Sequence, residues 1–393
     1  METIKGFRDF ILDEASKREE IRKILVGTFE KYGFSPAETP VLEQEEFVKG
    51  NNSNDEAVSD IFRLEDKGKR KLALRYEFTF QLKRLMNNQK LPFKRYEIGP
   101  VFRDEPVSGN RLRQFVQCDC DVVGSDIKDD AEILSLAKKV LDSLGIKFTI
   151  YVNNRELLNE VLEKENVKSP SEVIRILDKL DKLSESEVKE ELKKYNAEKL
   201  ISIFKQKESN FNEYKNYSQI KELKEYCDLY NVEIEFSPTL ARGLSYYNKT
   251  IFEIKTKEMK ETIVGGGAYF FNNTQCVGIS FGLDRLAMLS NIFPKKVDYL
   301  IVSLNEDKQA IKIAEKLRGA GTSCILSYGK PSKALAYANS YGINGVIFVG
   351  ADEVKKKQFK VKDMITGKEK ILTLEKKTKK NIILKRNGTA RKN

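Results

Sequence analysis

The 393-residue sequence contains no histidine. This absence excludes a serine–histidine–aspartate triad, a cysteine–histidine pair, an imidazole general base and any histidine metal ligand. The five cysteines form no C-x-x-C pair, and the C-x-C spacing of Cys118 and Cys120 does not suit a zinc site. We therefore predict no metal site in the protein, and reduced thiols as in a cytosol.

The sequence also lacks the patterns of several other protein classes. It has no run of about 18 apolar residues, so we expect no contact with a membrane through a spanning helix. The first ten residues show no apolar run followed by small residues, which predicts no secretory signal and a cytoplasmic protein. There is no Walker A loop, and Gly265-Gly-Gly267 does not fit the G-x-G-x-x-G of a dinucleotide site. An isolated triple glycine marks a tight turn or a place where the backbone passes close to another group.

Positive charge is concentrated at one end of the chain. Lys and Arg number 70 against 59 Asp and Glu, a net charge of +11. Residues 351–393 alone hold 15 Lys and Arg against 5 Asp and Glu. A basic region on a near-neutral body favours a polyanionic partner, most simply nucleic acid. A solvated lysine-rich tail without a partner accounts for the charge equally well.

The length is sufficient for two domains, and the sequence pattern changes near residue 297. Before that point, apolar periodicity predicts helices over residues 14–32 and 129–144. Residues 94–102 and 113–123 are rich in Tyr, Ile, Val and Phe and are joined by turn residues. They predict an antiparallel hairpin with a long polar loop.

Residues 154–233 contain no glycine and are rich in Lys, Glu, Leu and Asn. We interpret them as an inserted helical module that acts as a solvated spacer, with direct contact to RNA as the alternative. Residues 234–290 return to strands, with the triple glycine between them and a last helix from Leu283 to Ser290.

From Val297 onward, strands and helices alternate in the order βαβαβ, and a hairpin follows around Thr366-Gly367. This order predicts a separate domain built on a parallel sheet. The expected architecture is an α+β domain with an antiparallel sheet over residues 1–293, carrying the helical insertion, and a C-terminal α/β domain with a basic tail over residues 297–393.

Five arginines lie at predicted strand ends, turns or helix starts. Arginine offers a rigid fork of donors that suits phosphate oxygens. Three of them converging on one sheet would form a triphosphate clamp, whereas each alone is more commonly part of a surface ion pair. The five are Arg103, Arg111, Arg113, Arg242 and Arg285.

Three segments resemble motifs of the class II aminoacyl-tRNA synthetases. Arg95-Tyr-Glu-Ile-Gly-Pro-Val-Phe-Arg103-Asp-Glu105, followed by Arg111-Leu-Arg113-Gln-Phe115, resembles motif 2. Val277-Gly-Ile-Ser-Phe-Gly-Leu-Asp-Arg285-Leu resembles motif 3. Gly33-Phe-Ser-Pro-Ala-Glu-Thr-Pro40 resembles motif 1, whose proline lies at the dimer interface of that class. Motifs 2 and 3 in this order, about 180 residues apart, are a specific signal.

Within that class the chain is most similar to the histidyl-tRNA synthetases. Leu240-Ala-Arg242-Gly-Leu-Ser-Tyr246-Tyr247 resembles the histidine-specific segment of that family. Leu74-Arg-Tyr-Glu77-Phe-Thr79 resembles its amino-acid-binding segment, and Gln117-Cys-Asp-Cys-Asp121 the strand after the motif 2 loop. The resemblance runs nearly end to end, with the C-terminal region in the place of the family's anticodon-binding domain.

The resemblance implies ATP-dependent ligation of L-histidine to tRNA(His) through a histidyl-adenylate, with Mg²⁺, by a homodimer formed through the catalytic domain. It implies that Arg103 holds the ATP α-phosphate and Arg285 the γ-phosphate. Arg242 would face the α-phosphate and the substrate carboxylate, and completes the set of catalytic arginines. Glu105 and Arg113 would contact the nucleotide.

The resemblance also implies a histidine pocket. Glu77, Thr79 and Gln117 would bind the substrate α-amino group. Asp121 and Tyr247 would pair with the two imidazole nitrogens, and Tyr246 would lie beside them. A buried acceptor that faces an imidazole N–H gives discrimination, because an analogue without that group leaves a polar atom unpaired.

The chemistry of such an enzyme does not require a histidine side chain. The substrate carboxylate is itself the nucleophile when the adenylate forms. Catalysis then consists of positioning and of stabilising the charge that develops at phosphorus, which arginines and Mg²⁺ supply.

Two segments depart from the family pattern. Gly266-Gly-Ala-Tyr-Phe270 stands where the family usually has Gly-Gly-Arg-Tyr-Asp, and Ser245 stands where Asp is usual. Asp121 is shorter than the Glu of bacterial members, as in archaeal-type sequences. These departures concern the amino-acid pocket more than the ATP site.

Two other functions stay open at this point. A catalytically inactive, synthetase-like regulator would bind histidine or tRNA without ligating them, although such relatives lack the anticodon domain. Another class II synthetase, for glycine, proline or threonine, is disfavoured by the segment from Arg242 to Tyr247. The missing histidine also has two interpretations: an enzyme that can be translated when histidine runs out, or drift in a Lys- and Asn-rich proteome.

Overall fold

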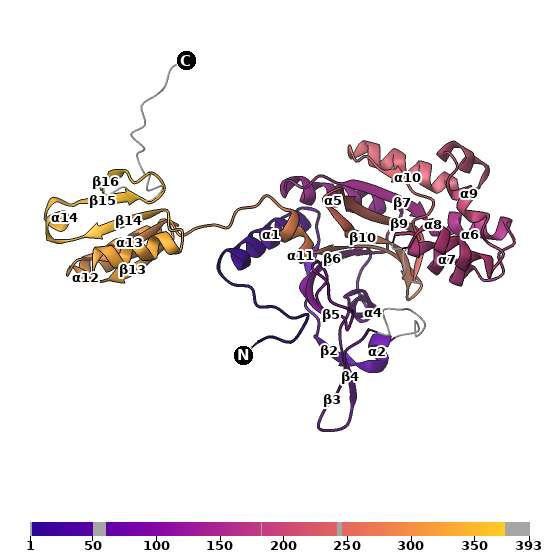
Figure 1. Ribbon diagram of the computed structural model, residues 1–393, viewed down its shortest axis with the longest axis horizontal. Coiled ribbons are helices and arrows are strands. Elements are labelled where there is room, and N and C mark those ends of the chain that lie inside the picture. Colours follow the sequence, from indigo (N-terminus) through magenta and orange to yellow (C-terminus); the bar gives the residue numbers. More distant parts are fainter. Residues whose placement is uncertain (1, 50–59, 182, 242–245, 374–393) are drawn as a thin grey trace, which may run out of the picture. The chain divides into compact units, whose positions relative to one another are not determined.

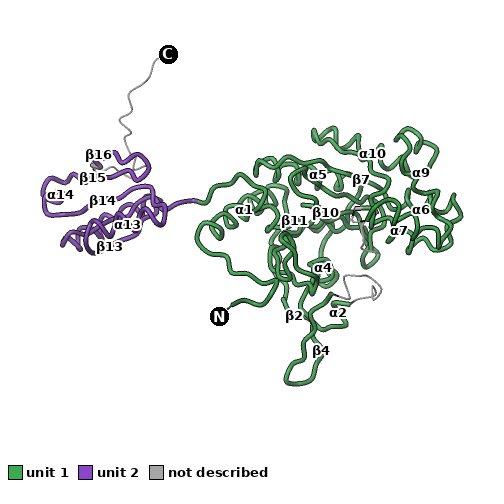
Figure 2. The backbone as a smooth tube through the Cα atoms, viewed as in Figure 1, with its two compact units in different colours: residues 1–294 green, residues 295–393 purple. Residues whose placement is uncertain are grey.

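The computed structural model describes residues 2–49, 60–181, 183–241 and 246–373. The chain separates into two compact units, residues 1–294 and 295–393 (Figure 2). Arg242 and Ser245, two candidate pocket residues, lie outside the described residues. Within the described ranges, no helix has the length and apolar character needed to cross a membrane.

The first unit is built on an eight-stranded sheet (Figure 1). Its inner strands pair antiparallel, and the edge pairs β1–β5 and β7–β8 are parallel. The predicted antiparallel sheet and its long hairpin are confirmed. In sheet order the strands are β1 (Ser35–Pro36), β5 (Phe93–Phe102), β6 (Gln114–Val123), β11 (Thr274–Gly282), β10 (Met259–Phe271), β9 (Tyr247–Thr256), β7 (Thr149–Asn154) and β8 (Glu235–Phe236).

The two faces of this sheet differ in polarity. Successive residues of a strand point to opposite faces. On β6, Cys118 and Cys120 belong to the hydrophobic core under the helices. Gln117, Asp119 and Asp121 alternate with them and line a cavity on the other face. The alternation of apolar and polar residues along β6 therefore separates the core from the candidate site.

Helices α1 (Leu12–Lys31), α5 (Ile127–Ser143) and α11 (Leu283–Leu289) cover the apolar face. The helix expected over 129–144 begins two residues earlier, because Asp126 is its N-cap. The Asp126 side chain accepts a hydrogen bond from the Lys128 N–H, and the Asp129 side chain accepts one from the Asp126 N–H. This capping box satisfies backbone donors in the first turn.

The segment over residues 154–233 is helical, as expected. Its helix α10 packs on α5, so the insertion shares one continuous hydrophobic core with the sheet. The elements are α6 (Arg155–Lys164), α7 (Pro170–Asp178), η1 (Lys179–Asp181), α8 (Glu185–Lys193), α9 (Leu200–Phe204), η2 (Glu208–Glu213) and α10 (Tyr217–Leu229).

A small three-stranded sheet of order β2–β4–β3 extends from the first unit beneath the large sheet in Figure 1. Its chain leads directly into the short helix α4, whose first turn carries part of the candidate site. These elements are β2 (Leu42–Gln44), α2 (Glu45–Lys49), β3 (Arg63–Glu65), β4 (Lys71–Leu74) and α4 (Thr79–Leu85).

The prediction that the triple glycine separates two strands is wrong. Gly265, Gly266 and Gly267 lie within β10 and pair with both β9 and β11. A Cβ atom at Gly266 would stand 2.1 Å from the carbonyl oxygen of Gly278 on β11. Glycine is required there because two backbones approach more closely than a side chain allows.

The second unit has a five-stranded sheet of order β13–β12–β14–β15–β16. The first three strands are parallel and the last two antiparallel, which confirms the predicted βαβαβ order followed by a hairpin. Its elements are β12 (Tyr299–Ser303), α12 (Asp307–Gly319), β13 (Cys324–Tyr328), α13 (Pro331–Ser340), β14 (Gly345–Val349), α14 (Ala351–Lys356), β15 (Gln358–Asp363) and β16 (Glu369–Thr373).

Candidate active site

A cavity of about 690 Å³ lies on the polar face of the large sheet, within the first unit. Its volume suits a small-molecule site. Most of the predicted site residues come together on its wall, from segments far apart in the sequence. These are Glu77, Thr79, Arg103, Glu105, Gln117, Asp121, Tyr246, Tyr247 and Arg285.

Among the predicted site residues that the structure describes, Arg113 is the one that is not on this wall. The Arg113 guanidinium pairs with Asp104 at 3.1 Å and donates to the Glu105 carbonyl oxygen, while its neighbour Arg111 lines the cavity. Arg242 lies outside the described residues.

One end of the cavity is cationic. Arg103, Arg111 and Arg285 line it, and Glu105 pairs with Arg111 at 3.0 Å and with Arg103 at 3.9 Å. Burial lowers the pKa of Arg285 from its ordinary value; Glu261 opposes this, and the charges of Arg111 and Arg103 lower it further. Guanidinium groups that repel one another around a cavity are stabilised when an anion enters it.

The residue before Arg285 fixes the position of α11. The Asp284 carboxylate accepts a hydrogen bond from the Val116 N–H at 3.0 Å and pairs with Arg18 at 2.8 Å. Asp284 thereby ties the start of α11 to β6 and α1. Arg285 itself donates to the Thr262 carbonyl oxygen at 2.5 Å, which directs its guanidinium along the cavity wall.

The other end of the cavity is acidic. Burial raises the pKa of the Glu77 carboxyl to about 7, against the opposing effects of the Arg103 charge and a hydrogen bond from Tyr246. Burial also raises the pKa of Asp119 well above its ordinary value, and that of Asp121 less because Arg95 and Tyr269 oppose the shift. Such an excess of buried carboxyl groups favours a cationic ligand.

Several buried oxygens at this acidic end accept no hydrogen bond from the described residues. They include Oε1 of Glu77, Oε1 of Gln117 and Oδ2 of Asp121. Buried acceptors without donors are costly, so they indicate where a ligand donor belongs. An ammonium group has three N–H donors and fits the first two acceptors. An imidazole N–H fits the third.

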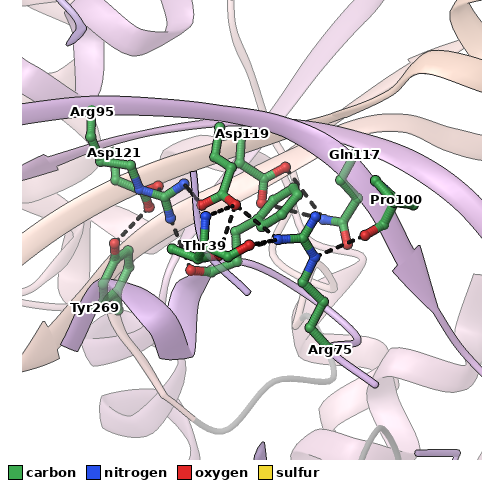
Figure 3. Close-up of polar contacts among 10 residues, drawn as sticks. Thr39, Arg75, Arg95, Pro100, Gln117, Asp119, Asp121 and Tyr269 are labelled. Atoms are coloured by element: carbon green, nitrogen blue, oxygen red, sulfur yellow. Dashed lines mark hydrogen bonds and ion pairs between the residues drawn. The ribbon is translucent and has the colours of Figure 1, made fainter. Parts of the chain in front are cut away.

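Asp121 is held from several sides (Figure 3). The Tyr269 hydroxyl donates to its Oδ1 at 2.6 Å, and Arg95 Nη2 lies 2.9 Å from its Oδ2. Gly278 is its partner on β11, where a Cβ atom would stand 2.1 Å from Oδ1. The missing side chain at Gly278 is what allows Asp121 and Tyr269 to meet.

Aromatic rings pack behind the acidic end. Tyr246 lies against Tyr247, Tyr269 and Phe271, and its hydroxyl donates to Glu77 Oε2 at 3.3 Å. Burial raises the pKa of Tyr246 well above its ordinary value, so it stays a neutral donor. These contacts hold Glu77 toward the cavity.

The departures at the glycine-rich segment lie outside the cavity wall. Ala268 is 2% exposed and belongs to the protein interior, whereas Phe270 is 50% exposed. Neither lines the cavity, while Tyr269 between them does. The retained tyrosine therefore faces the site, and the two replaced positions do not.

Three residues on the acidic side are not identified by the sequence patterns: Asp119, Arg95 and Tyr269. Asp119 lies between Gln117 and Asp121 on the same face of β6 and lines the cavity. The strict alternation from Gln117 to Asp121 could have identified it, because residues two apart in a strand share a face. The roles of Arg95 and Tyr269 depend on pairing across strands, which the sequence alone does not give.

Comparisons with known proteins agree with this geometry. A family model described as histidyl-tRNA synthetase matches residues 6–286, and a model described as anticodon binding domain matches residues 298–382. Histidine–tRNA ligase 1 of Bacillus cereus is 34% identical over 94% of this chain and 96% of its own length. Histidine–tRNA ligase of Wolinella succinogenes is 34% identical over 94% and 95%.

Solved structures show the same relationship. The crystal structure of histidyl-tRNA synthetase from Nostoc sp. PCC 7120 superposes with a TM-score of 0.83 at 26% identity, covering 95% of this chain and 96% of that one. A Bacillus halodurans protein, titled as an ATP phosphoribosyltransferase regulatory subunit/histidyl-tRNA synthetase, shares the fold with a TM-score of 0.75 at 21% identity, covering 88% and 97%. The chain belongs to the histidyl-tRNA synthetase family of class II aminoacyl-tRNA synthetases.

Proposed function

We propose that this protein ligates L-histidine to tRNA(His) in two steps, through a histidyl-adenylate. One observation carries the proposal: a single cavity is lined by a cluster of arginines and by buried acceptors that receive no hydrogen bond from the described residues. ATP would place its phosphates at the cationic end. The α-ammonium group and the imidazole of histidine would lie at the acidic end. This arrangement brings the substrate carboxylate toward the α-phosphate between them.

In the nucleotide half, Arg103 would bind the α-phosphate and Arg285 the γ-phosphate. Arg242 would face the α-phosphate and the substrate carboxylate, and Glu105 and Arg113 would contact the nucleotide. The guanidinium groups then stabilise the charge that develops as the carboxylate oxygen attacks the α-phosphorus and pyrophosphate leaves. The substrate carboxylate needs no deprotonation, so a chain without histidine can perform this step.

Two carboxylates on the cavity wall, Glu105 and Glu253, suit Mg²⁺ that arrives with ATP. Such an ion is commonly bound by one or two carboxylates together with substrate phosphates. It would neutralise phosphate charge when bound. Glu253 is held in place by the Thr262 hydroxyl, which donates to it at 2.9 Å, and by an ion pair with Lys255 at 3.2 Å.

In the amino-acid half, Glu77, Thr79 and Gln117 would bind the α-ammonium group. Asp121 and Tyr247 would pair with the imidazole nitrogens, with Tyr246 beside them. In the second step, a hydroxyl of the terminal tRNA ribose attacks the carbonyl carbon of the adenylate, and AMP leaves. The second unit, matched by the anticodon-binding model, would hold the anticodon end of tRNA.

The protein would act in the cytoplasm as a homodimer formed through the catalytic domain. The resemblance of residues 33–40 to motif 1 supports this arrangement, and this segment is hydrogen-bonded to buried residues next to the site. The Thr39 N–H and hydroxyl both donate to Glu97 Oε1, at 3.0 and 2.7 Å, and Arg75 donates to the Thr39 carbonyl oxygen (Figure 3). A second copy packed against motif 1 would thus contact a segment that is hydrogen-bonded to Arg75, two residues before Glu77.

Replacement of Arg285 tests the ATP assignment. We expect Arg285→Met to lower kcat/KM for ATP at least 100-fold in histidine-dependent ATP–pyrophosphate exchange, and to lower tRNA charging in parallel. Arg318→Met is the matched control for the exchange reaction, which needs no tRNA, because this exposed arginine pairs with Glu315 on α12 in the other unit. Exchange and charging by Arg285→Met at the rates of the wild type would refute the assignment. Absence of charging by the folded wild type would favour a regulator.

A further inference from the structure

Arg95 is a charged residue deep under the amino-acid pocket to which the proposed chemistry gives no role. It lies on β5 and is 1% exposed. In the antiparallel ladder of β5 and β6 its partner is Asp121. A buried guanidinium is costly unless its neighbours compensate the charge, so its contacts indicate what it is for.

The Arg95 guanidinium joins the two segments that form the amino-acid pocket (Figure 3). Its Nη2 lies 2.9 Å from Asp121 Oδ2 and donates to the Phe78 carbonyl oxygen at 3.0 Å. Phe78 lies between Glu77 and Thr79, the residues assigned to the α-ammonium group. One guanidinium therefore contacts both the imidazole side and the ammonium side of the pocket.

The hydrogen bonds around Asp121 leave one oxygen available. Oδ1 accepts from the Tyr269 hydroxyl at 2.6 Å. Oδ2 forms an ion pair with Arg95 Nη2 at 2.9 Å but accepts no hydrogen bond from the described residues. Arg95 thus supplies positive charge beside Oδ2. A carboxylate oxygen has two lone pairs, so Oδ2 can also accept a ligand N–H.

The groups around Asp121 explain why a cation is needed beside it. Asp121 shares its surroundings with Asp119 on the same strand, Glu77 before α4, Tyr269 on β10 and Cys276 on β11. Each of these is neutral or anionic at neutral pH. Arg95 is the cation that faces Asp121 among the described residues that shift its pKa. Without Arg95, a buried carboxyl between other carboxyls would take up a proton.

We propose that Arg95 is a positioning residue of the histidine pocket, which places its charge beside Asp121 Oδ2, orients that oxygen to accept the imidazole N–H, and ties the Glu77–Thr79 segment to the same guanidinium. The inference rests on the proposed function of that pocket. Lysine at this position would keep the charge but lacks the planar fork that reaches two acceptors. The two parts of the role can therefore be separated by substitution.

The test is a double-mutant cycle in ATP–pyrophosphate exchange with histidine. We expect Arg95→Gln to raise KM for histidine at least tenfold at pH 7.5 and to change KM for ATP less than twofold. The effect grows as pH falls, because Asp121 without the neighbouring Arg95 charge takes up a proton more readily. In an Asp121→Asn background, Arg95→Gln raises KM for histidine by a clearly smaller factor, because only its contact with the Phe78 carbonyl oxygen is then lost.

Arg95→Lys covers the case in which Arg95→Gln fails to fold. We expect it to raise KM for histidine a few-fold while keeping the pH dependence of the wild type. Arg155→Gln is the matched control, since Arg155 is also buried but lies at the start of α6 and does not line the cavity. In the double variant with Asp121→Asn, the two fold-changes in KM for histidine should simply multiply. The control substitution alone should not change the pH dependence of KM for histidine.

The outcomes separate this inference from the function on which it rests. If both Arg95 variants multiply with Asp121→Asn, or if they raise KM for ATP as much as KM for histidine, Arg95 is only structural and the inference is overturned. If the wild type shows no exchange with histidine, or Asp121→Asn leaves KM for histidine unchanged, the proposed pocket itself is wrong.

Discussion

Glu77 is a buried carboxyl on the cavity wall, and in the proposed function it pairs with the ammonium group of histidine. Its pKa is about 7, because burial outweighs the Arg103 charge and the Tyr246 hydrogen bond. The chain has no histidine, so no imidazole of the protein titrates near neutral pH. Changes in histidine binding near pH 7 therefore report on buried carboxyls and on the substrate.

We predict that histidine binding weakens as pH falls through 7. Below its pKa Glu77 is protonated and must lose that proton before it can pair with an ammonium group. KM for histidine should be about fourfold higher at pH 6.5 than at pH 8. KM for ATP, measured in the same exchange reactions, is the internal control. A flat histidine profile, or an ATP profile of the same shape, would contradict this role.

The same carboxyl should destabilise the unliganded protein at high pH. Its pKa in the folded protein is about 7, against 4.5 for the ordinary group. The protonated carboxyl therefore contributes to the free energy of unfolding in full below pH 4.5, and this contribution is lost as pH rises through 7. The loss is about 3 kcal/mol at most. Glu77→Gln should therefore unfold at a higher temperature than the wild type at pH 8, with a smaller difference at pH 5, and lose histidine-dependent exchange. A variant that is less stable at both pH values would refute this prediction.

At the scale of the elements, the close approach of β6, β11 and β10 shapes the pocket. Gly278 lies between Asp121 and Gly267 in these strands. We predict that Gly278→Ala displaces the Asp121 carboxylate, because the new Cβ would meet Oδ1 at 2.1 Å. KM for histidine should rise at least tenfold with KM for ATP nearly unchanged, in exchange assays on the folded variant.

Gly27→Ala is the control for that substitution. Gly27 lies within α1, and a Cβ atom there would meet no atom within 4 Å. Its kinetics should match the wild type, and the free energy of unfolding should rise by up to about 1 kcal/mol because alanine favours helix. Equal kinetics for the two glycine variants would show that the space at Gly278 is not needed by the site.

The elements themselves follow from periodicity and capping wherever one pattern dominates. The predicted bounds of helix α1 and of the strands β5 and β6 agree with the structure to within two residues. The prediction for the triple glycine is wrong because glycine occurs both in turns and at close backbone contacts. Only the pairing of these residues with β11 distinguishes the two cases. The motif resemblance locates most of the cavity wall. It does not identify Arg95, whose role arises from its cross-strand position opposite Asp121.

At the scale of the whole molecule, catalysis and tRNA binding are assigned to two different units. Residues 375–393 hold 8 Lys and Arg and one Glu. We predict that truncation after Leu374 raises KM for tRNA several-fold and flattens its salt dependence. The log–log slope should fall by about 0.7–0.9 for each tRNA phosphate that the shorter protein no longer neutralises. Histidine-dependent exchange without tRNA should not change. An unchanged tRNA affinity and salt slope would mean that the tail has no role in binding.

The family could be recognised from the sequence because motifs 2 and 3 and the histidine-specific segment are contiguous strings. Sequence motifs alone do not distinguish a histidine–tRNA ligase from a regulator or from a synthetase for a different amino acid. The comparisons establish the family, and the geometry adds one cavity with opposite charge at its two ends. That division of charge could not be read from composition, because Arg103, Glu77 and Arg285 come from distant segments.

The measurement that tests the central claim most directly is ATP–pyrophosphate exchange with each of the twenty amino acids supplied separately. We predict exchange with histidine and with no other amino acid, because the acidic end of the cavity requires both an ammonium group and an imidazole N–H. Exchange with a different amino acid would contradict the pocket assignment. No exchange with any of them, from a folded protein, would contradict the enzyme and leave the regulator.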